Sequence, residues 1–101
     1  MRTIMVRYKT KPERADENER LIRKVFEELR ENSPAGIRYA SFKLADGQSF
    51  VHIATIETAD GSNPLTQTLA FKSFLVGVID RCAEPPVTTE LSEVGSYRFF
   101  G

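Results

Sequence analysis

Two runs of β-prone residues that alternate between hydrophobic and polar flank the pair Asp46-Gly47. A type I′ turn requires a positive φ at both of its central residues, and an Asp-Gly pair is among those that such a turn prefers. The two-residue turn predicts a β-hairpin in which Ser41 lies opposite His52. Successive side chains of a strand point to opposite faces, so the hairpin has one almost wholly apolar side and one mixed side. The apolar side carries Ala40, Phe42, Leu44, Val51 and Ile53, and the mixed side carries Tyr39, Ser41, Lys43, Phe50, His52 and Ala54.

Before the hairpin, the hydrophobic spacing changes from the period of a strand to that of a helix. Residues 3–9 alternate in polarity, which predicts a strand, and Pro12 ends it because proline cannot donate to a ladder. From about Arg14 the hydrophobic residues recur at helical spacing, until the Asn-Ser-Pro run at 32–34 stops the helix. The hydrophobic stripe places Asn18 on the inward side, where it would be a buried polar group. A solvated Asn near the helix start is the alternative.

After the hairpin, a loop leads to a second helix and a last strand. Thr68 is the predicted N-cap, because its hydroxyl can accept from free N–H groups of the next turn. Hydrophobic residues at helical spacing predict a helix over residues 69–82. Residues 87–94 alternate in polarity and predict a strand. Gly95 suggests a bulge or kink, after which residues 96–100 are expected to continue the strand.

The order of these elements is β-α-β-β-α-β, the ferredoxin-like pattern of an α+β protein. We expect residues 1–101 to form a single domain, in which two helices cover one face of a four-stranded antiparallel sheet. No further predicted element covers the other face, and the sequence closes on the aromatic run at residues 97–100. Exposed apolar surface of this kind usually marks an interface. The sequence therefore predicts a homodimer in which the two sheets face each other.

Composition narrows the classes of partner. Fourteen basic and fourteen acidic residues cancel, which disfavours a nucleic-acid-binding protein with a basic face. No hydrophobic run is long enough to span a membrane, the first residues lack the hydrophobic stretch of a signal peptide, and the single Cys82 cannot form an internal disulfide. We therefore expect a cytoplasmic protein that binds neither nucleic acid nor a membrane. One His, one Cys and no clustered acids predict no metal site.

Four features of the chain carry a resemblance to a known family. They are the short first strand ending at Lys11-Pro12, the acidic first helix, the Asp46-Gly47 hairpin and the run Leu69-Ala70-Phe71-Lys72-Ser73-Phe74. With these the chain resembles the dimeric α+β barrel superfamily, above all its small antibiotic-biosynthesis-monooxygenase-like members. The resemblance implies a homodimer with a cavity between the sheet and helices of each subunit. Characterised members oxidise aromatic polyketide-like compounds there with dioxygen, so no metal, flavin or other cofactor is expected. The chain departs from the haem-degrading branch, which relies on Trp and on a second-helix His, because it has neither.

His52 is the candidate for acid–base chemistry, because imidazole titrates near neutral pH. In the predicted hairpin it lies opposite Ser41 and on the same face as Tyr39 and Phe50. Such a group within an aromatic wall would deprotonate a phenolic substrate and give an electron-rich anion that reacts with dioxygen. The candidate catalytic residues are therefore His52, Tyr39 and Asn18, and the candidate substrate contacts are Ser41, Phe50, Phe71 and Phe74.

A second interpretation makes His52 an ordinary sheet residue at the dimer interface, and Phe71 and Phe74 ordinary core residues. The choice depends on which side of the hairpin meets the helices. Unpaired buried polar groups cost roughly 1–3 kcal/mol each, so the simplest core packs the apolar side against the helices and points His52 at the partner.

Two functions remain open from the sequence. One is a small cofactor-independent monooxygenase-like enzyme that acts on or binds an aromatic compound. The other is a non-enzymatic homodimer that binds a small ligand or accompanies a pathway. A cavity within each subunit that holds His52 or Asn18 beside aromatic walls would favour the enzyme.

Overall fold

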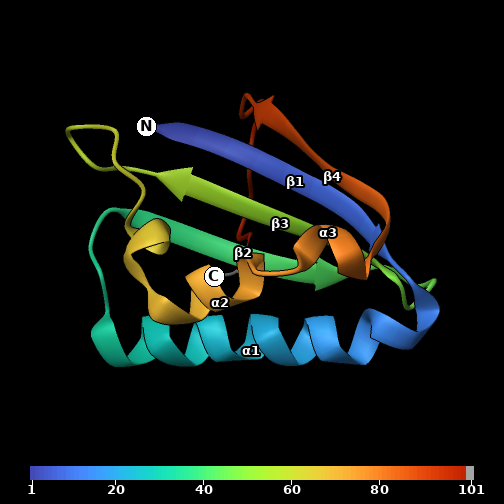
Figure 1. Ribbon diagram of the computed structural model, residues 1–101. Coiled ribbons are helices and arrows are strands. Elements are labelled where there is room, and N and C mark those ends of the chain that lie inside the picture. Colours follow the sequence, from blue (N-terminus) through green and yellow to red (C-terminus); the bar gives the residue numbers. More distant parts are fainter. Residues whose placement is uncertain (100–101) are drawn as a thin grey trace.

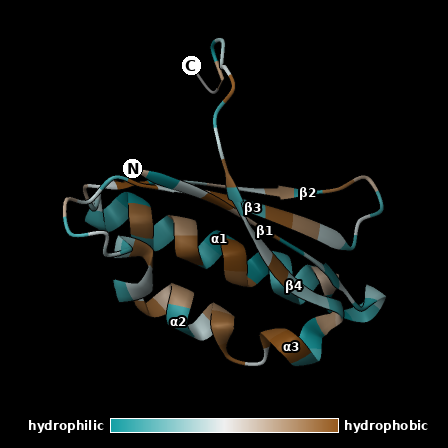
Figure 2. Ribbon diagram, turned by 90° about the horizontal axis from the view of Figure 1, so that it is seen from above, coloured by the Kyte–Doolittle hydropathy of each residue, from teal (hydrophilic) through white to brown (hydrophobic). Residues whose placement is uncertain are grey.

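The computed structural model describes residues 1–99 and consists of a four-stranded antiparallel sheet with its helices on one face (Figures 1 and 2). The sheet order is β2-β3-β1-β4, so the second and fourth strands form the edges. This is the ferredoxin-like α+β arrangement that the sequence predicted. The elements are β1 (Arg2–Thr10), η1 (Pro12–Arg14), α1 (Ala15–Asn32), β2 (Ile37–Lys43), β3 (Ser49–Ile56), η2 (Pro64–Gln67), α2 (Leu69–Leu75), α3 (Val78–Arg81) and β4 (Cys82–Leu91).

The predicted hairpin register is confirmed, although its turn is of another type. Ser41 pairs with His52 across β2 and β3. The N–H of Gly47 donates to the carbonyl of Leu44 at 3.0 Å, and Gly47 has φ +73° while Asp46 does not enter the left-handed region. The expectation of a type I′ turn was therefore wrong, because that turn needs a positive φ at both residues. The register is nevertheless kept, because the N–H of Leu44 donates to the carbonyl of Ser49 at 2.9 Å across the longer loop.

The mixed side of the hairpin, and not the apolar side, packs against the helices. Along β3, the buried residues Phe50, His52 and Ala54 alternate with the half-buried Val51 and Ile53. The expectation that the apolar side would meet the helices was wrong. Its premise was the cost of unpaired polar groups, but within residues 1–99 no buried side-chain nitrogen or oxygen lacks a hydrogen-bond partner.

The second helical segment is shorter than predicted and divided in two. α2 ends at Leu75, Gly77 adopts φ +76°, and the following turn of α3 leads directly into β4 at Cys82. The predicted single helix over residues 69–82 is therefore wrong at its C-terminal end. Pro85 and Pro86 lie inside β4, where an edge strand tolerates residues that cannot donate to a neighbour.

The N-terminus of α2 is attached to α1 by hydrogen bonds. Thr68 caps it as predicted, because its Oγ1 accepts from the N–H of Phe71 at 3.2 Å. The carboxylate of Glu28 on α1 accepts from the N–H groups of Leu69 at 3.0 Å and Ala70 at 2.9 Å. These bonds fix the aromatic residues of α2 above the sheet.

The residues after β4 form an arm instead of a strand. Residues 92–99 leave the end of β4 and project from the sheet on the side opposite the helices (Figure 2). The predicted continuation of the strand over residues 96–100 is wrong for residues 96–99, and residue 100 lies outside the described residues. Val94 and Tyr97 on this arm are largely exposed.

Candidate active site

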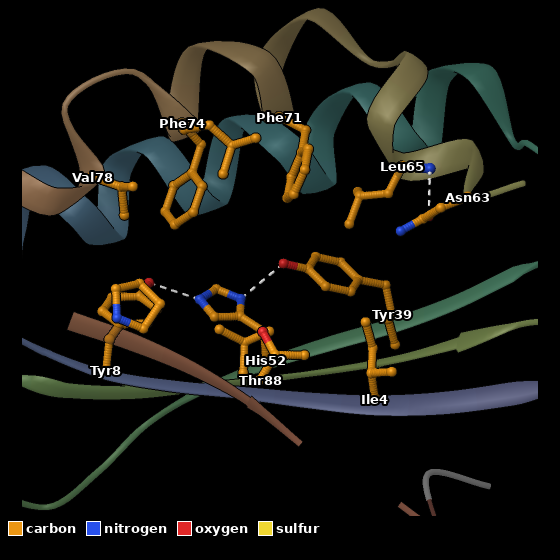
Figure 3. Close-up of a pocket in the computed structure, with 14 residues that line it drawn as sticks. Ile4, Tyr8, Tyr39, His52, Asn63, Leu65, Phe71, Phe74, Val78 and Thr88 are labelled. Atoms are coloured by element: carbon orange, nitrogen blue, oxygen red, sulfur yellow. Dashed lines mark hydrogen bonds between the residues drawn. The ribbon is translucent and has the colours of Figure 1, made fainter. Parts of the chain in front are cut away.

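His52 lies on the helix-covered face of the sheet with a tyrosine on either side (Figure 3). β3 pairs it with Val6 of β1 and Ser41 of β2, so Tyr8 and Tyr39 occupy diagonal positions on the two neighbouring strands. The three rings are nearly parallel. The centroids of Tyr8 and His52 are 5.3 Å apart with an angle of 11° between the planes, and those of Tyr39 and His52 are 5.9 Å apart with 13°.

Both ring nitrogens of His52 are hydrogen-bonded. Nε2 lies 2.7 Å from the hydroxyl of Tyr8, and Nδ1 lies 2.8 Å from the hydroxyl of Tyr39 and 2.6 Å from that of Ser41. His52 as a whole residue is only 6% exposed. It is therefore held in one orientation by three hydroxyl groups, none of which is charged.

Behind Tyr8, the hydrogen bonds continue to a buried guanidinium. Asn18 Nδ2 donates to the hydroxyl of Tyr8 at 2.8 Å, and Arg81 Nε donates to Asn18 Oδ1 at 3.1 Å. Arg81 also donates to the carbonyls of Val76 at 3.0 Å and Phe74 at 2.6 Å, and its guanidinium carbon lies 5.1 Å from the centre of the Phe74 ring. Asn18 is fully buried and Arg81 is 1% exposed. Every member of the chain of hydrogen bonds from Arg81 to His52 is therefore a buried residue, and Ser41 at its end is half-buried.

A cavity of about 240 Å³ lies between this row of rings and the helices. Figure 3 shows His52, Tyr8 and Tyr39 facing Phe71, Phe74 and Val78 across the space. Its walls are mainly apolar, and its polar lining residues are His52 with its two tyrosines, together with Asn63 and Thr88. The lining residues are Ile4, Val6, Tyr8, Tyr39, His52, Ala54, Asn63, Leu65, Phe71, Phe74, Leu75, Val78, Pro86 and Thr88.

Burial keeps His52 and the two tyrosines beside it neutral. It lowers the pKa of His52 to about 4, because no opposite charge compensates for the desolvation of an imidazolium. It raises the pKa of Tyr39 to about 12, against the lowering effect of the Ser41 hydroxyl. It also raises the pKa of Tyr8 well above its ordinary value, although the hydrogen bond from Asn18 opposes this. At neutral pH the imidazole of His52 is therefore neutral.

The structure brings four of the predicted site residues to the cavity. His52, Tyr39, Phe71 and Phe74 all line it. The ring of Phe74 meets that of His52 edge-on, with 5.6 Å between the centroids. The interpretation of His52 as an interface residue was therefore wrong, since its ring faces the helices of its own chain.

The other three predicted residues lie close to the cavity but do not line it. Asn18 lies behind Tyr8, and Ser41 contacts the Nδ1 edge of His52 from beside a surface groove under α1. Phe50 is buried and stacks on Tyr8 with 5.6 Å between the centroids. The prediction that Asn18 is a buried polar group is confirmed.

Sequence reasoning missed two residues of the site, Tyr8 and Arg81. Tyr8 had a signal, because it alternates with Ile4 and Val6 on the first strand, but its importance follows only once β1 is paired with β3. Arg81 had none, because a lone arginine near the end of a predicted helix usually faces solvent. Its burial depends on the turn at Gly77, which carries α3 back toward the sheet.

Within residues 1–99, no group of three or more His, Cys, Asp or Glu side chains could hold a metal ion. No helix in the same part of the chain is long and apolar enough to cross a membrane. The groups at the cavity are suited to acid–base chemistry, namely a neutral imidazole beside two phenols in a mainly apolar pocket.

No protein-family model and no curated protein sequence matches this chain. Solved structures do match it. A Nitrosomonas europaea protein, provisionally named an antibiotic biosynthesis monooxygenase, is 20% identical with a TM-score of 0.76, over 94% of this chain and all of that one. Rv0793 of Mycobacterium tuberculosis is 16% identical with a TM-score of 0.74, over 94% of this chain and 96% of its own. A mutant of SnoaB, a cofactor-independent oxygenase of Streptomyces nogalater, is 13% identical with a TM-score of 0.68, over 96% of each chain.

At these identities the matches establish the architecture and leave the reaction to be argued from the site. They agree with the resemblance that the sequence indicated. The chain has the fold of the antibiotic-biosynthesis-monooxygenase-like proteins.

Proposed function

We propose that this protein is a cofactor-independent monooxygenase-like enzyme that binds a small aromatic compound and oxidises it with dioxygen. The observation that carries the proposal is the cavity between sheet and helices, in which the neutral imidazole of His52 lies between Tyr8 and Tyr39. The likeness to SnoaB, whose name gives it as a cofactor-independent oxygenase, supports the same class of reaction.

The shape and chemistry of the cavity support the proposed class of substrate. A volume of about 240 Å³ lies below the roughly 300–1,000 Å³ of pockets for drug-sized ligands, so the ligand is small. Phe71 and Phe74 supply aromatic faces, and aromatic rings pack well against them. The phenols of Tyr8 and Tyr39 supply hydrogen-bonding groups on the sheet side of the cavity. We infer a flat, phenolic, mainly apolar substrate.

The reaction balances if the substrate itself supplies the electrons. A methylene group between aromatic rings loses a proton toward His52, and the resulting carbanion forms a C–O bond to dioxygen. The imidazolium returns its proton to the peroxide, and loss of water with cleavage of the O–O bond leaves a ketone. The methylene carbon is oxidised, dioxygen is reduced, and one of its oxygen atoms leaves as water. The apolar walls favour this sequence because they keep bulk water from the carbanion.

Oxygen uptake tests the proposal directly. With 1,8-dihydroxyanthrone as the probe, the protein should consume dioxygen faster than a protein-free blank and yield the ketone. His52→Ala should lower the rate about a hundredfold or more, the usual contribution of a general base. Thr55→Ala, on the other face of the same strand, is the matched control and should retain the rate.

Two results of this experiment would contradict the proposal. Thermal stabilisation by the anthrone without oxygen uptake above the blank would contradict the enzyme and support a non-enzymatic small-ligand-binding protein. Wild-type uptake that His52→Ala leaves unchanged, with the variant still folded by its thermal transition, would reject the role of His52 as the base.

We also propose that a second copy of this chain covers the outer face of the sheet, in a cytoplasmic homodimer. Val51, Ile53 and Val87 leave apolar surface on that face, and Val87 is 61% exposed. The arm that follows β4 projects on the same side and carries the exposed Val94 and Tyr97 (Figure 2). Exposed apolar surface on this scale is typical of an interface.

A further inference from the structure

We propose that Arg81 and Asn18 are positioning residues that hold His52 in the tautomer with its proton on Nδ1, so that Tyr8 is the group through which a ligand's proton reaches Nε2. The tautomer follows from hydrogen-bond geometry alone, and the role of Tyr8 in proton transfer rests on the proposed function. Asn18 thus acts through Tyr8 and does not itself touch the ligand.

The first step is the orientation of the Asn18 amide. A guanidinium has only N–H donors, so the atom of Asn18 that faces Arg81 Nε at 3.1 Å must be the oxygen. The amide nitrogen then faces Tyr8, and Asn18 Nδ2 donates to the hydroxyl oxygen at 2.8 Å. Two carbonyls hold the guanidinium itself, so it cannot turn away from Asn18.

The second step concerns the single hydrogen of the Tyr8 hydroxyl. Its oxygen accepts from Asn18, and its second hydrogen-bond partner is His52 Nε2 at 2.7 Å. If Nε2 carried a proton, the oxygen would accept twice and the hydroxyl hydrogen would have no acceptor among the residues that the structure describes. Tyr8 therefore donates to Nε2, which must be unprotonated. In a neutral imidazole the proton then belongs to Nδ1.

The far side of the ring fits this tautomer. Nδ1 has two oxygen atoms within reach, that of Ser41 at 2.6 Å and that of Tyr39 at 2.8 Å. Each can accept the Nδ1–H. The direction of donation therefore runs unbroken from Arg81 through Asn18, Tyr8 and His52 to these hydroxyls.

The tautomer decides which atom meets the ligand. The lone pair of Nε2 is occupied by the Tyr8 hydroxyl, whereas the Tyr8 oxygen retains a second lone pair and its ring lines the cavity. A proton leaving the ligand binds to this oxygen while the hydrogen already there passes to Nε2. One O–H bond forms and one breaks, Tyr8 ends neutral, and the imidazolium lies beside the new anion. Tyr8 is thus the contact residue and His52 holds the proton.

The chain's single histidine makes the tautomer directly measurable. In protein labelled with ¹⁵N-histidine, protonated and unprotonated ring nitrogens have well separated ¹⁵N chemical shifts. At pH 7.5 and without ligand, we expect Nδ1 in the protonated range and Nε2 in the unprotonated range. The reverse assignment in the wild-type protein would overturn the proposal.

Asn18→Asp is the decisive variant, because it keeps the shape of the side chain and reverses its hydrogen bonding. A carboxylate beside Arg81 accepts from the Tyr8 hydroxyl, which leaves the Tyr8 oxygen to accept from Nε2–H. We expect the two imidazole resonances to exchange ranges. Asn63→Asp adds the same charge at another part of the cavity wall, where Asn63 Oδ1 accepts from the N–H of Leu65, and should leave the tautomer unchanged.

Tyr8→Phe supplies a second measurement that does not depend on how Asn18→Asp folds. Without the hydroxyl, Nε2 loses the hydrogen bond it accepts, and its resonance should move to the position of a nitrogen with no donor. An unchanged Nε2 resonance in Tyr8→Phe, or an unchanged tautomer in folded Asn18→Asp, would overturn the proposal. These spectra are recorded without substrate, so a failed oxygen-uptake experiment would reject the proposed function and leave the tautomer standing.

Discussion

The two faces of the sheet differ in a way that hydrophobicity alone does not predict. The face under the helices carries His52, Tyr8 and Ser41, together with the hydrogen bonds that reach Arg81. The open face of β3 carries the apolar residues Val51 and Ile53, which are only half-buried. The imidazole and its hydroxyl partners therefore lie in the interior, while these apolar side chains of the same strand lie on the open face.

The two faces of the sheet therefore suit different roles, namely chemistry at the cavity and contact with another sheet. A polar group can be buried at low cost only where partners are fixed around it, and the helices provide them through Asn18 and Arg81. The cavity beside those groups is thus prearranged for chemistry. The apolar face needs no fixed partners, and is suited to contact with another sheet of the same kind.

The largest expected effect comes from comparing an inner and an outer arginine. Arg81→Met leaves Asn18 Oδ1 and two carbonyls without their donor, and should lower the free energy of unfolding by about 3 kcal/mol or more. Arg38→Met removes an ion pair with Glu57 whose arginine side chain is 78% exposed, and should cost less than about 1 kcal/mol. Urea unfolding of both variants measures the difference. Equal losses would show that the buried network does not stabilise the fold.

The next largest effect is a loss of stability between pH 7.5 and 5, which we expect from His52 on the inner face. The pKa of His52 is lowered to about 4 in the folded protein, from 6.5, so between these values the unfolded chain binds more protons. Stability is therefore complete above about pH 6.5 and falls as the pH drops toward 4. Between pH 7.5 and 5 the wild-type protein should lose on the order of 2 kcal/mol.

His52→Gln is the control for this measurement, because glutamine retains hydrogen-bonding capacity and does not titrate. Its free energy of unfolding should be nearly constant over the same interval. The carboxylates whose pKa values are lowered, such as that of Glu19 beside Lys43, begin to lose their contribution only nearer pH 4.5. A wild-type protein with no loss of stability down to pH 5 would contradict the burial of a neutral imidazole.

The order and pairing of the strands could be predicted from the sequence because they follow from alternation and turn position. The pairing of Ser41 with His52 follows from the position of the turn between the two strands. It was therefore predicted correctly although the turn type was not. The face that points inward could not be predicted in the same way. It depends on whether distant groups satisfy the polar side chains, and here Asn18 and Arg81, far apart in the sequence, do so.

The candidate site was predictable in part for the same reason. His52, Tyr39, Phe71 and Phe74 could be found because each lies in phase with a regular hydrophobic pattern. Arg81 could not, because its burial follows from the interruption at Gly77, which divides the helix that periodicity predicted to be continuous. Local patterns therefore predicted the walls of the cavity but missed the buried end of its hydrogen-bond chain.

The smallest expected change in stability belongs to the open face, where a charge should alter association and little else. Ile53→Lys adds an ammonium group to a half-buried position of β3. At concentrations where the wild-type protein is monomeric, the free energy of unfolding should change by about 0.5 kcal/mol or less, as for most surface substitutions.

At micromolar concentration and above, light scattering should report a dimer for the wild-type protein and a monomer for the variant. Lys24→Glu, on the exposed side of α1, should remain dimeric. A monomeric wild-type protein, or a dimer that Ile53→Lys does not weaken, would show that this apolar face is not the surface through which two copies associate.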